Sequence, residues 1–196
     1  MDREWRGRRP EHPVTAGQGL PSRMLQTTRT EDAERVAFRQ EDATRWSLRA
    51  IQRVSLPRSE VFHFFADAGN LAHITPPELG FHILTPQPIA MGAGALIDYR
   101  IRLWGIAMSW LTEITTWNPP NEFIDTQLRG PYAEWVHRHR FIAVTEGSTL
   151  VEDYVQFRLP MRQFGAIASA IVRRQLRRIF DYRRSAIARL KIGNRE

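Results

Sequence analysis

Two histidines separated by one residue are the side chains of this sequence best suited to chemistry. His137 and His139 lie in the run Trp-Val-His-Arg-His-Arg-Phe, and residues two apart on a strand point to the same face. An imidazole titrates near neutral pH, so the pair can act as general base and general acid in aldol-type cyclisation or dehydration. Asp125 and Asp153 are the carboxylates expected nearby. The alternative role is a hydrogen-bonded pair in the wall of a cavity.

The same pattern is compatible with a metal site, because two imidazoles on one face and a carboxylate are metal ligands. The sequence offers no further cluster of ligating residues. It contains no cysteine, which excludes thiolate ligands and a thiolate nucleophile. It also lacks the nucleophile-elbow, Walker and dinucleotide-binding motifs. We therefore expect neither a metal nor a cofactor.

The histidines belong to a predicted strand from Ala133 to Val144, whose two faces differ. One face carries Arg138 and Arg140 and therefore belongs outside, whereas the other is mostly aromatic. The predicted inner set is Trp135, His137, His139 and Phe141.

The two predicted strands on either side supply the carboxylates. From Glu122 to Arg129 we assign Asp125 and Gln127 to the inner face, because they then share a face with the histidines and can hydrogen-bond them. From Thr149 to Leu159 the predicted inner set is Val151, Asp153, Val155 and Phe157.

A two-residue turn fixes the register of another hairpin. Trp104-Gly105 separates the predicted strands from Ala95 to Leu103 and from Ile106 to Trp117. This turn pairs Tyr99 with Trp110 and places both on an apolar inner face. A slip of one residue would exchange the two faces, so the pattern determines the register.

The longest periodic segment, from Met161 to Lys191, predicts an amphipathic helix. It contains no proline, and its apolar side chains recur every three or four residues. They are Phe164, Ile167, Ala168, Ile171, Val172, Leu176, Ile179, Phe180, Ile187 and Leu190. We expect a curved sheet to close around this apolar face.

Arginine dominates the rest of that helix. Residues 161–191 carry eight arginines and one lysine against Asp181 alone, so the excess positive charge of the chain, whose net charge is +7, lies in this helix. Much of the excess lies at Arg173, Arg174, Arg177, Arg178, Arg183 and Arg184. We interpret these arginines as a solvated outer face. Binding of this face to RNA, to the ribosome or to an anionic membrane surface is the alternative.

The first 44 residues are rich in charge, proline, glycine and threonine and poor in large apolar side chains. Such a segment buries too little surface to offset the entropy of ordering. We predict a disordered extension over residues 1–44, with a short helix around Glu31 to Gln40 as an option, and one folded domain over 45–192. The domain begins with a strand from Trp46 to Val54.

Two short helices follow that strand, then six strands and the long helix. The first helix carries the apolar run that ends at Ala66, and the second runs from Leu71 to Ile74. A first short strand from Gly80 to Thr85 precedes the strands described above. The order predicts an α+β domain with a seven-stranded antiparallel sheet wrapped around the long C-terminal helix.

Several segments match sequence patterns that are typical of a known superfamily. They are Leu56-Pro-x-x-x-Val61-Phe62-x-Phe64-Phe65, Ile74-Thr-Pro-Pro77, Gly130-Pro-Tyr-x-x-Trp135-x-His137-x-His139-x-Phe141 and Phe180-x-Tyr-Arg-Arg184. Over about Trp46 to Leu190 the chain resembles the START-like or SRPBCC superfamily, and within it the bacterial ligand-binding proteins of polyketide cyclase/dehydrase type. The resemblance implies a helix-grip fold. It leaves function open, because the superfamily includes lipid carriers, hormone receptors, ubiquinone-binding proteins and aromatase/cyclases.

The inferred inner faces describe a mostly aromatic cavity with a few polar groups, which is the composition of a small-molecule site. We predict that the protein binds a hydrophobic, aromatic or polyketide-like small molecule between sheet and helix. The expected ligand-binding residues are Tyr99, Trp110, Gln127, Trp135, His137, His139, Phe141 and Ile171. The enzymatic alternative, a polyketide cyclase or dehydratase, assigns catalysis to His137, His139, Asp125 and Asp153.

The location of the protein is predicted from its apolar segments. No apolar run approaches the ~20 residues that a membrane span needs, and the N-terminus lacks the apolar segment of a secretory signal. We expect a cytoplasmic protein whose main partner is a small hydrophobic ligand. The sequence leaves the oligomeric state open.

Overall fold

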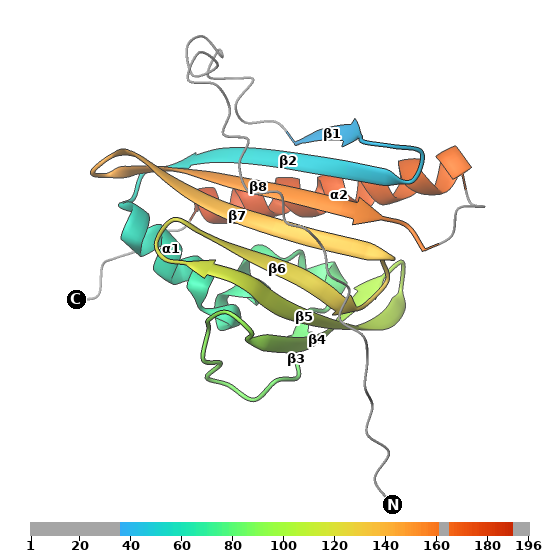
Figure 1. The fold of residues 1–196 in the computed structure, drawn as a ribbon, viewed down its shortest axis with the longest axis horizontal. Helices are drawn as coiled ribbons and strands as arrows, with labels where there is room; N and C mark the ends of the chain where they lie inside the picture. Colours follow the sequence, from blue (N-terminus) through green and yellow to red (C-terminus); the bar gives the residue numbers. More distant parts are fainter. Residues whose placement is uncertain (1–35, 161–164, 190–196) are drawn as a thin grey trace, which may run out of the picture.

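An antiparallel sheet of eight strands and one long helix form most of the folded chain (Figure 1). The computed structural model describes residues 36–160 and 165–189. The strands are β1 (Ala37–Gln40), β2 (Arg45–Val54), β3 (His82–Ile83), β4 (Leu96–Leu103), β5 (Ile106–Asn118), β6 (Glu122–Arg129), β7 (Glu134–Thr145) and β8 (Ser148–Arg158). The helices are α1 (Arg58–Ala66), the 3-10 helices η3 (Ala68–Ile74) and η4 (Pro77–Leu79), and α2 (Gly165–Ala188).

The strand order across the sheet is β1-β2-β8-β7-β6-β5-β4-β3. Strands β3 to β8 therefore form a meander, and β2 pairs with the last strand. Register shifts within β5 mark irregularities of the β-bulge type, which bend a strand and increase its twist. Helix α2 runs behind β2 and β8 in Figure 1, so it covers one face of the sheet.

The predicted α+β helix-grip architecture is confirmed, but the sheet has eight strands where seven were expected. The additional strand is β1, which pairs antiparallel with β2 from Ala37 opposite Arg49 to Gln40 opposite Trp46. It lies within the segment predicted as a disordered extension with an optional helix. Four residues are too few to display an alternating pattern, which explains the error.

Contacts with α2 hold β1 in place. The Arg177 guanidinium donates a hydrogen bond of 3.2 Å to the carbonyl oxygen of Val36, and it lies 5.4 Å from the ring centre of Phe38. The folded unit therefore begins at least nine residues before the predicted boundary at residue 45. Residues 1–35 lie outside the described part of the chain.

Other predicted elements are close to those observed. The long helix was predicted from Met161 to Lys191 and is described over Gly165–Ala188, while residues 161–164 and 190–191 lie outside the described ranges. The predicted strand from Gly80 to Thr85 is reduced to β3. Its continuation leaves the ladder, because the backbone amides of Leu84 and Thr85 both donate to the single carbonyl oxygen of Asp98.

The predicted hairpin register is confirmed. Strand β4 pairs with β5 so that Tyr99 faces Trp110 and Leu103 faces Ile106. Trp104 and Gly105 have φ angles of 51° and 79°, and positive φ at both central residues is the property of the turn that matches strand twist in a two-residue hairpin.

One stripe of α2 enters the core. Val172, Leu176, Phe180 and Ile187 are buried, at spacings of four, four and seven residues. Complete burial of each such side chain contributes about 1.5–3 kcal/mol. Within the described residues, no helix is both long and apolar enough to cross a lipid bilayer.

Candidate functional site

The register of three neighbouring strands brings the predicted polar residues together. Asp125 on β6 lies opposite His137 on β7, and His139 on β7 lies opposite Asp153 on β8. Directly opposite residues share a face of the sheet, and so do residues two apart on one strand. We name these four residues, together with Arg183 of α2, the polar cluster.

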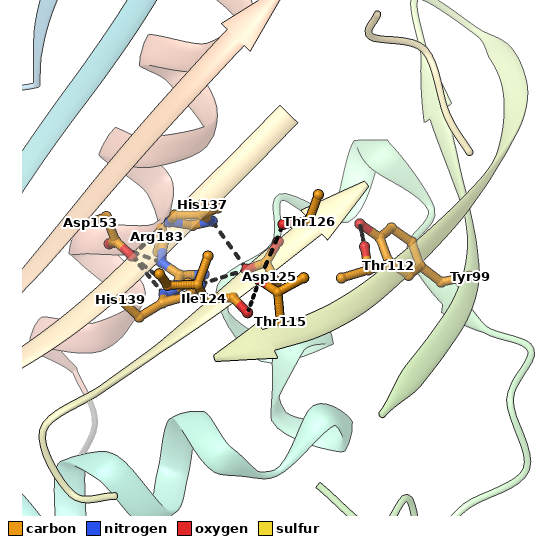
Figure 2. A network of polar contacts seen from close by, with 10 residues as sticks. All are labelled: Tyr99, Thr112, Thr115, Ile124, Asp125, Thr126, His137, His139, Asp153 and Arg183. Carbon is orange, nitrogen blue, oxygen red and sulfur yellow. Dashed lines mark hydrogen bonds and ion pairs between the residues drawn. The ribbon is translucent and has the colours of Figure 1, made fainter. Parts of the chain in front are cut away.

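Short contacts join the members of the polar cluster (Figure 2). The two imidazoles lie between the two carboxylates, with His139 Nε2 at 2.8 Å from Asp125 Oδ2 and His139 Nδ1 at 2.9 Å from Asp153 Oδ1. His137 Nε2 is 3.0 Å from the same Asp153 oxygen, whereas His137 Nδ1 is 3.7 Å from Asp125 Oδ2. Asp153 therefore contacts both rings from one side and Asp125 approaches both from the other.

Arg183 completes the cluster from the helix side. Its Nε donates to Asp153 Oδ2 at 3.3 Å, and its Nη2 donates to Asp153 Oδ1 at 3.4 Å. Its guanidinium also lies 5.0 Å from the ring centre of Phe65. Only 6% of Arg183 is exposed, so this is a buried ion pair in which each charge depends on the other.

The cluster moves the pKa values of the two histidines in opposite directions. Burial alone would lower the pKa of His139, but hydrogen bonds to Asp125 and Asp153 outweigh burial and raise this pKa. Burial lowers the pKa of His137, and the neighbouring His139 lowers it further. His139 therefore keeps a second proton to a higher pH than His137 does.

The carboxyl group of Asp153 is held in its charged form. Burial alone would raise its pKa, but the Arg183 guanidinium and the two imidazoles hold this pKa well below the usual range. Burial also raises the pKa values of the Tyr99 and Tyr132 phenols, so both remain neutral wall groups.

Rings enclose the two imidazoles. Phe123 stacks on His139 with ring centres 4.2 Å apart, and the two imidazole centres are 3.8 Å apart. Phe180 of α2 meets His137 with its ring centre at 5.7 Å. Such packing limits the rotation of both side chains.

A cavity of about 180 Å³ lies beside the polar cluster, between the sheet, the short helices and α2. Six predicted site residues line it: Tyr99, Trp110, Asp125, Trp135, His137 and His139. Tyr99 stacks on Trp110 with ring centres 5.7 Å apart, and Trp135 meets Trp110 edge to face at 5.3 Å. The predicted aromatic wall and the predicted polar groups thus face one space.

Three predicted ligand-binding residues and one predicted catalytic residue do not line this cavity. Phe141 is fully buried, and its ring packs against Phe62 and Phe65 in the hydrophobic core and not against the cavity. Asp153 lies behind the histidines. Gln127 donates from Nε2 to the carbonyl oxygen of Tyr132 at 2.7 Å and thereby braces the loop between β6 and β7.

Ile171 is 50% exposed and lines a second hollow of about 490 Å³. Its place follows from helix geometry, because residue 171 is turned by about 100° from residue 172, which lies on the buried stripe. The second hollow and the inner cavity share Leu103 and Tyr132 in their walls. Tyr132 therefore lies between the two spaces.

Arg183 is a residue of the cavity wall whose inward position the sequence interpretation missed, because it was assigned to the solvated outer face. A spacing signal was present: Leu176, Phe180, Arg183 and Ile187 follow one another at four, three and four residues, which is one face of a helix. The assignment gave more weight to the charge of Arg183 than to its position on the helix. Leu176, Phe180 and Arg183 form the helix side of the cavity wall.

Other arginines of α2 are engaged within the chain. The Arg173 guanidinium lies 4.0 Å from the ring centre of Trp46, Arg177 holds β1, and Arg178 pairs with Glu78 at 2.7 Å. Arg184 lies 3.9 Å from Asp181. These contacts give the arginine face a structural role of its own.

The polar cluster also contains a set of metal-ligating groups. One ligand atom from each of Asp125, His137 and His139 lies within 4.8 Å of the other two. Two imidazoles and a carboxylate are ligands for divalent transition metals.

No protein-family model matches the chain, and no curated protein matches it. Solved structures do match. The Zhui aromatase/cyclase from Streptomyces sp. R1128 is 16% identical, with a TM-score of 0.57 over 76% of this chain and 97% of that chain. A START superfamily protein from Mycobacterium smegmatis is 10% identical, with a TM-score of 0.57 over 72% and 96%. Protein CV1439 from Chromobacterium violaceum is 16% identical, with a TM-score of 0.58 over 76% and 99%.

The similarity to these structures concerns the fold. The chain has the START-like helix-grip fold that its sequence motifs predicted.

Proposed function

We propose that the protein binds a compact aromatic molecule in the inner cavity, with a polar group of that molecule directed at the polar cluster. The observation that carries the proposal is the lining: Tyr99, Trp110 and Trp135 face the same space as the two histidines. Ring side chains supply apolar contact area, and a few polar groups at one end fix the orientation of a ligand.

The volume of the cavity limits the ligand. An apolar cavity of roughly 150 Å³ holds a benzene molecule. The inner cavity, at about 180 Å³, therefore suits a single substituted ring. A polyketide with several fused rings requires displacement of Tyr132, which opens the path to the second hollow of about 490 Å³.

A hydrogen-bond donor in the wall suggests where the ligand carries an acceptor. Trp110 is buried, and its indole Nε1 has no hydrogen-bond partner among the described residues. A buried donor without a partner costs about 1–3 kcal/mol, which a ligand oxygen placed here recovers. We therefore favour an aromatic ligand with a carbonyl, ether or hydroxyl oxygen.

Binding is better supported than acid–base catalysis. Both nitrogens of His139 already lie within 3.0 Å of carboxylate oxygens, so neither faces a substrate. The fold similarity to an aromatase/cyclase keeps the polyketide cyclase or dehydratase alternative with His137 and His139, but it adds no residue-level argument. The engaged arginines of α2 weaken the RNA and membrane alternative.

A blocking variant tests the proposal. Thr112 is buried and lines the cavity, so Thr112→Phe fills the cavity with a ring. Thr115 on the same strand is exposed, and Thr115→Phe is the matched control. Single-ring aromatics with an acceptor oxygen are titrated against both variants and the unmodified chain.

The expected result is saturable quenching of tryptophan fluorescence and a raised melting temperature for the unmodified chain and Thr115→Phe. Ligand at 100 times its dissociation constant adds about 2.7 kcal/mol to the free energy of unfolding. Thr112→Phe should show neither change. Equal binding by Thr112→Phe, or no binding by the unmodified chain, contradicts the proposal.

A further inference from the structure

Two imidazole nitrogens face the carboxylate of Asp125 within the polar cluster. His137 Nε2 lies 3.0 Å from Asp153 Oδ1 and donates to it, whereas His139 Nδ1 lies 2.9 Å from that oxygen and 3.3 Å from the Arg183 Nη2 donor. In a neutral imidazole only one nitrogen carries a proton. The other nitrogen of His137, Nδ1, then presents a lone pair toward Asp125, and His139 presents Nε2 to the same carboxylate.

Three atoms that can ligate a metal ion therefore converge. His139 Nε2 is 2.8 Å and His137 Nδ1 is 3.7 Å from the same oxygen, Asp125 Oδ2. An imidazole lone pair and a carboxylate oxygen repel one another unless a proton or a metal ion lies between them. A proton on His139 satisfies its contact with Asp125 but leaves His137 Nδ1 without a donor, whereas a metal ion satisfies all three atoms.

We propose that Asp125, His137 and His139 bind one divalent transition-metal ion of the zinc or iron(II) class at the polar end of the inner cavity. The geometry fits this ion. Metal–ligand bonds of about 2.0–2.2 Å at tetrahedral angles separate ligand atoms by roughly 3.3 Å. The three ligand atoms lie within 4.8 Å of one another, and two of the separations, 2.8 and 3.7 Å, bracket that value.

Asp153 supplies the support that such a site requires. In metal sites a ligating histidine commonly donates its other ring nitrogen to a carboxylate, which fixes the tautomer and the ring orientation. Here Asp153 Oδ1 lies within 3.0 Å of the other ring nitrogen of both histidines and can accept from each of them when a metal is bound, and Arg183 holds that carboxylate with two hydrogen bonds. The sequence placed Asp153 on the inner face but offered no further cluster of ligating residues, which is why it favoured no metal.

Charge and access also suit a divalent ion. Arg183 neutralises Asp153, so the negative charge of Asp125 remains for the metal. Three protein ligands leave at least one coordination position open. All three ligands line the inner cavity, so the open position can face a bound molecule.

The test uses the full chain after removal of metals with EDTA. Co²⁺ is titrated while the visible absorption of the ion is followed, and Zn²⁺ is then added as a competitor. The expected result is one Co²⁺ per chain, displaced by one Zn²⁺. Asp125→Asn and His139→Gln should abolish the absorption. Asp153→Asn, which retains all three ligands, should weaken Co²⁺ binding by about 10–100-fold.

Exposed histidines provide the control. His73 and His82 are exposed, and a His73→Gln/His82→Gln double variant should bind Co²⁺ as the unmodified chain does. A folding-independent readout uses the ¹⁵N resonances of the histidine rings in the unmodified chain. Zn²⁺ should shift those of His137 and His139 and leave those of His73 and His82 in place. Failure to bind Co²⁺ or Zn²⁺, or binding lost only in the double variant, overturns the proposal.

Discussion

At the scale of single residues, the buried pair of Arg183 and Asp153 holds the polar cluster together. Asp153 contacts both imidazoles, and Arg183 supplies the positive charge that keeps Asp153 ionised. Charges removed from water are tolerated only when they are paired and hydrogen-bonded. Helix α2 therefore contributes Arg183, the residue that keeps Asp153 and the two histidines of the sheet in place.

Removal of Arg183 should destabilise the protein strongly. Arg183→Met leaves the carboxylate of Asp153 buried without its main partner, and we expect a loss of about 3–5 kcal/mol in the free energy of unfolding. Urea denaturation measures this loss. The control is Arg178→Met, whose pair with Glu78 is exposed and should contribute no more than about 1 kcal/mol. Equal effects of the two variants would refute the assigned role of Arg183.

The two histidines should give opposite pH dependences of stability in metal-free buffer. The raised pKa of His139 contributes stability that is complete below the ordinary value of 6.5 and is lost as pH rises through the folded-state pKa. The lowered pKa of His137 costs stability that grows as pH falls below 6.5.

Urea denaturation between pH 5 and pH 9 tests this, with EDTA present. Relative to the unmodified chain, His139→Gln should be most destabilised at the acidic end of the range, and the difference should shrink as pH rises. The free energy of unfolding of His137→Gln, relative to that of the unmodified chain, should be most favourable at the acidic end of the range. The same pH trend in both variants would show that the directions are wrongly assigned.

At the scale of elements, strand patterns predicted which side chains face the cavity better than the helix pattern did. Alternation along β7 and the Trp104-Gly105 turn placed Trp110, Trp135 and the histidines correctly, because a period of two leaves only two choices of face. On α2 the sequence placed Ile171 on the apolar face and Arg183 on the solvated face, whereas Ile171 is exposed and Arg183 is buried in the structure. Their sides depend on how α2 is rotated against the sheet, which is decided by packing partners distant in sequence.

The loop between β6 and β7 should control the size of the ligand that the protein accepts. Tyr132 lies in the walls of both spaces, and Gln127 binds its backbone through two hydrogen bonds. Tyr132→Ala should join the inner cavity to the second hollow. We expect this variant to gain affinity for two- and three-ring aromatics, measured by fluorescence titration.

The control for this prediction is Trp104→Ala. Trp104 lines the second hollow but not the inner cavity, so its removal should leave the preference for single rings unchanged. If Tyr132→Ala keeps the preference of the unmodified chain, Tyr132 is not the partition between the two spaces.

At the scale of the whole molecule, the helix-grip fold explains why one cavity is both aromatic and polar. The sheet contributes rings and imidazoles from β4 to β7, and α2 closes the space with Leu176, Phe180 and Arg183. The order of elements was predictable, since it follows from local periodicity and turns. Strand β1 and the volume of the cavity were not, because both depend on contacts between distant segments.

The most direct test of the central claim is an isotope-filtered NMR experiment on the labelled chain with a bound single-ring aromatic that carries an acceptor oxygen. We predict nuclear Overhauser contacts from the ligand protons to the indole protons of Trp110 and Trp135 and to the ring of Phe180, all of which line the inner cavity. Contacts confined to Trp104 and Ile171, in the second hollow, would contradict the account.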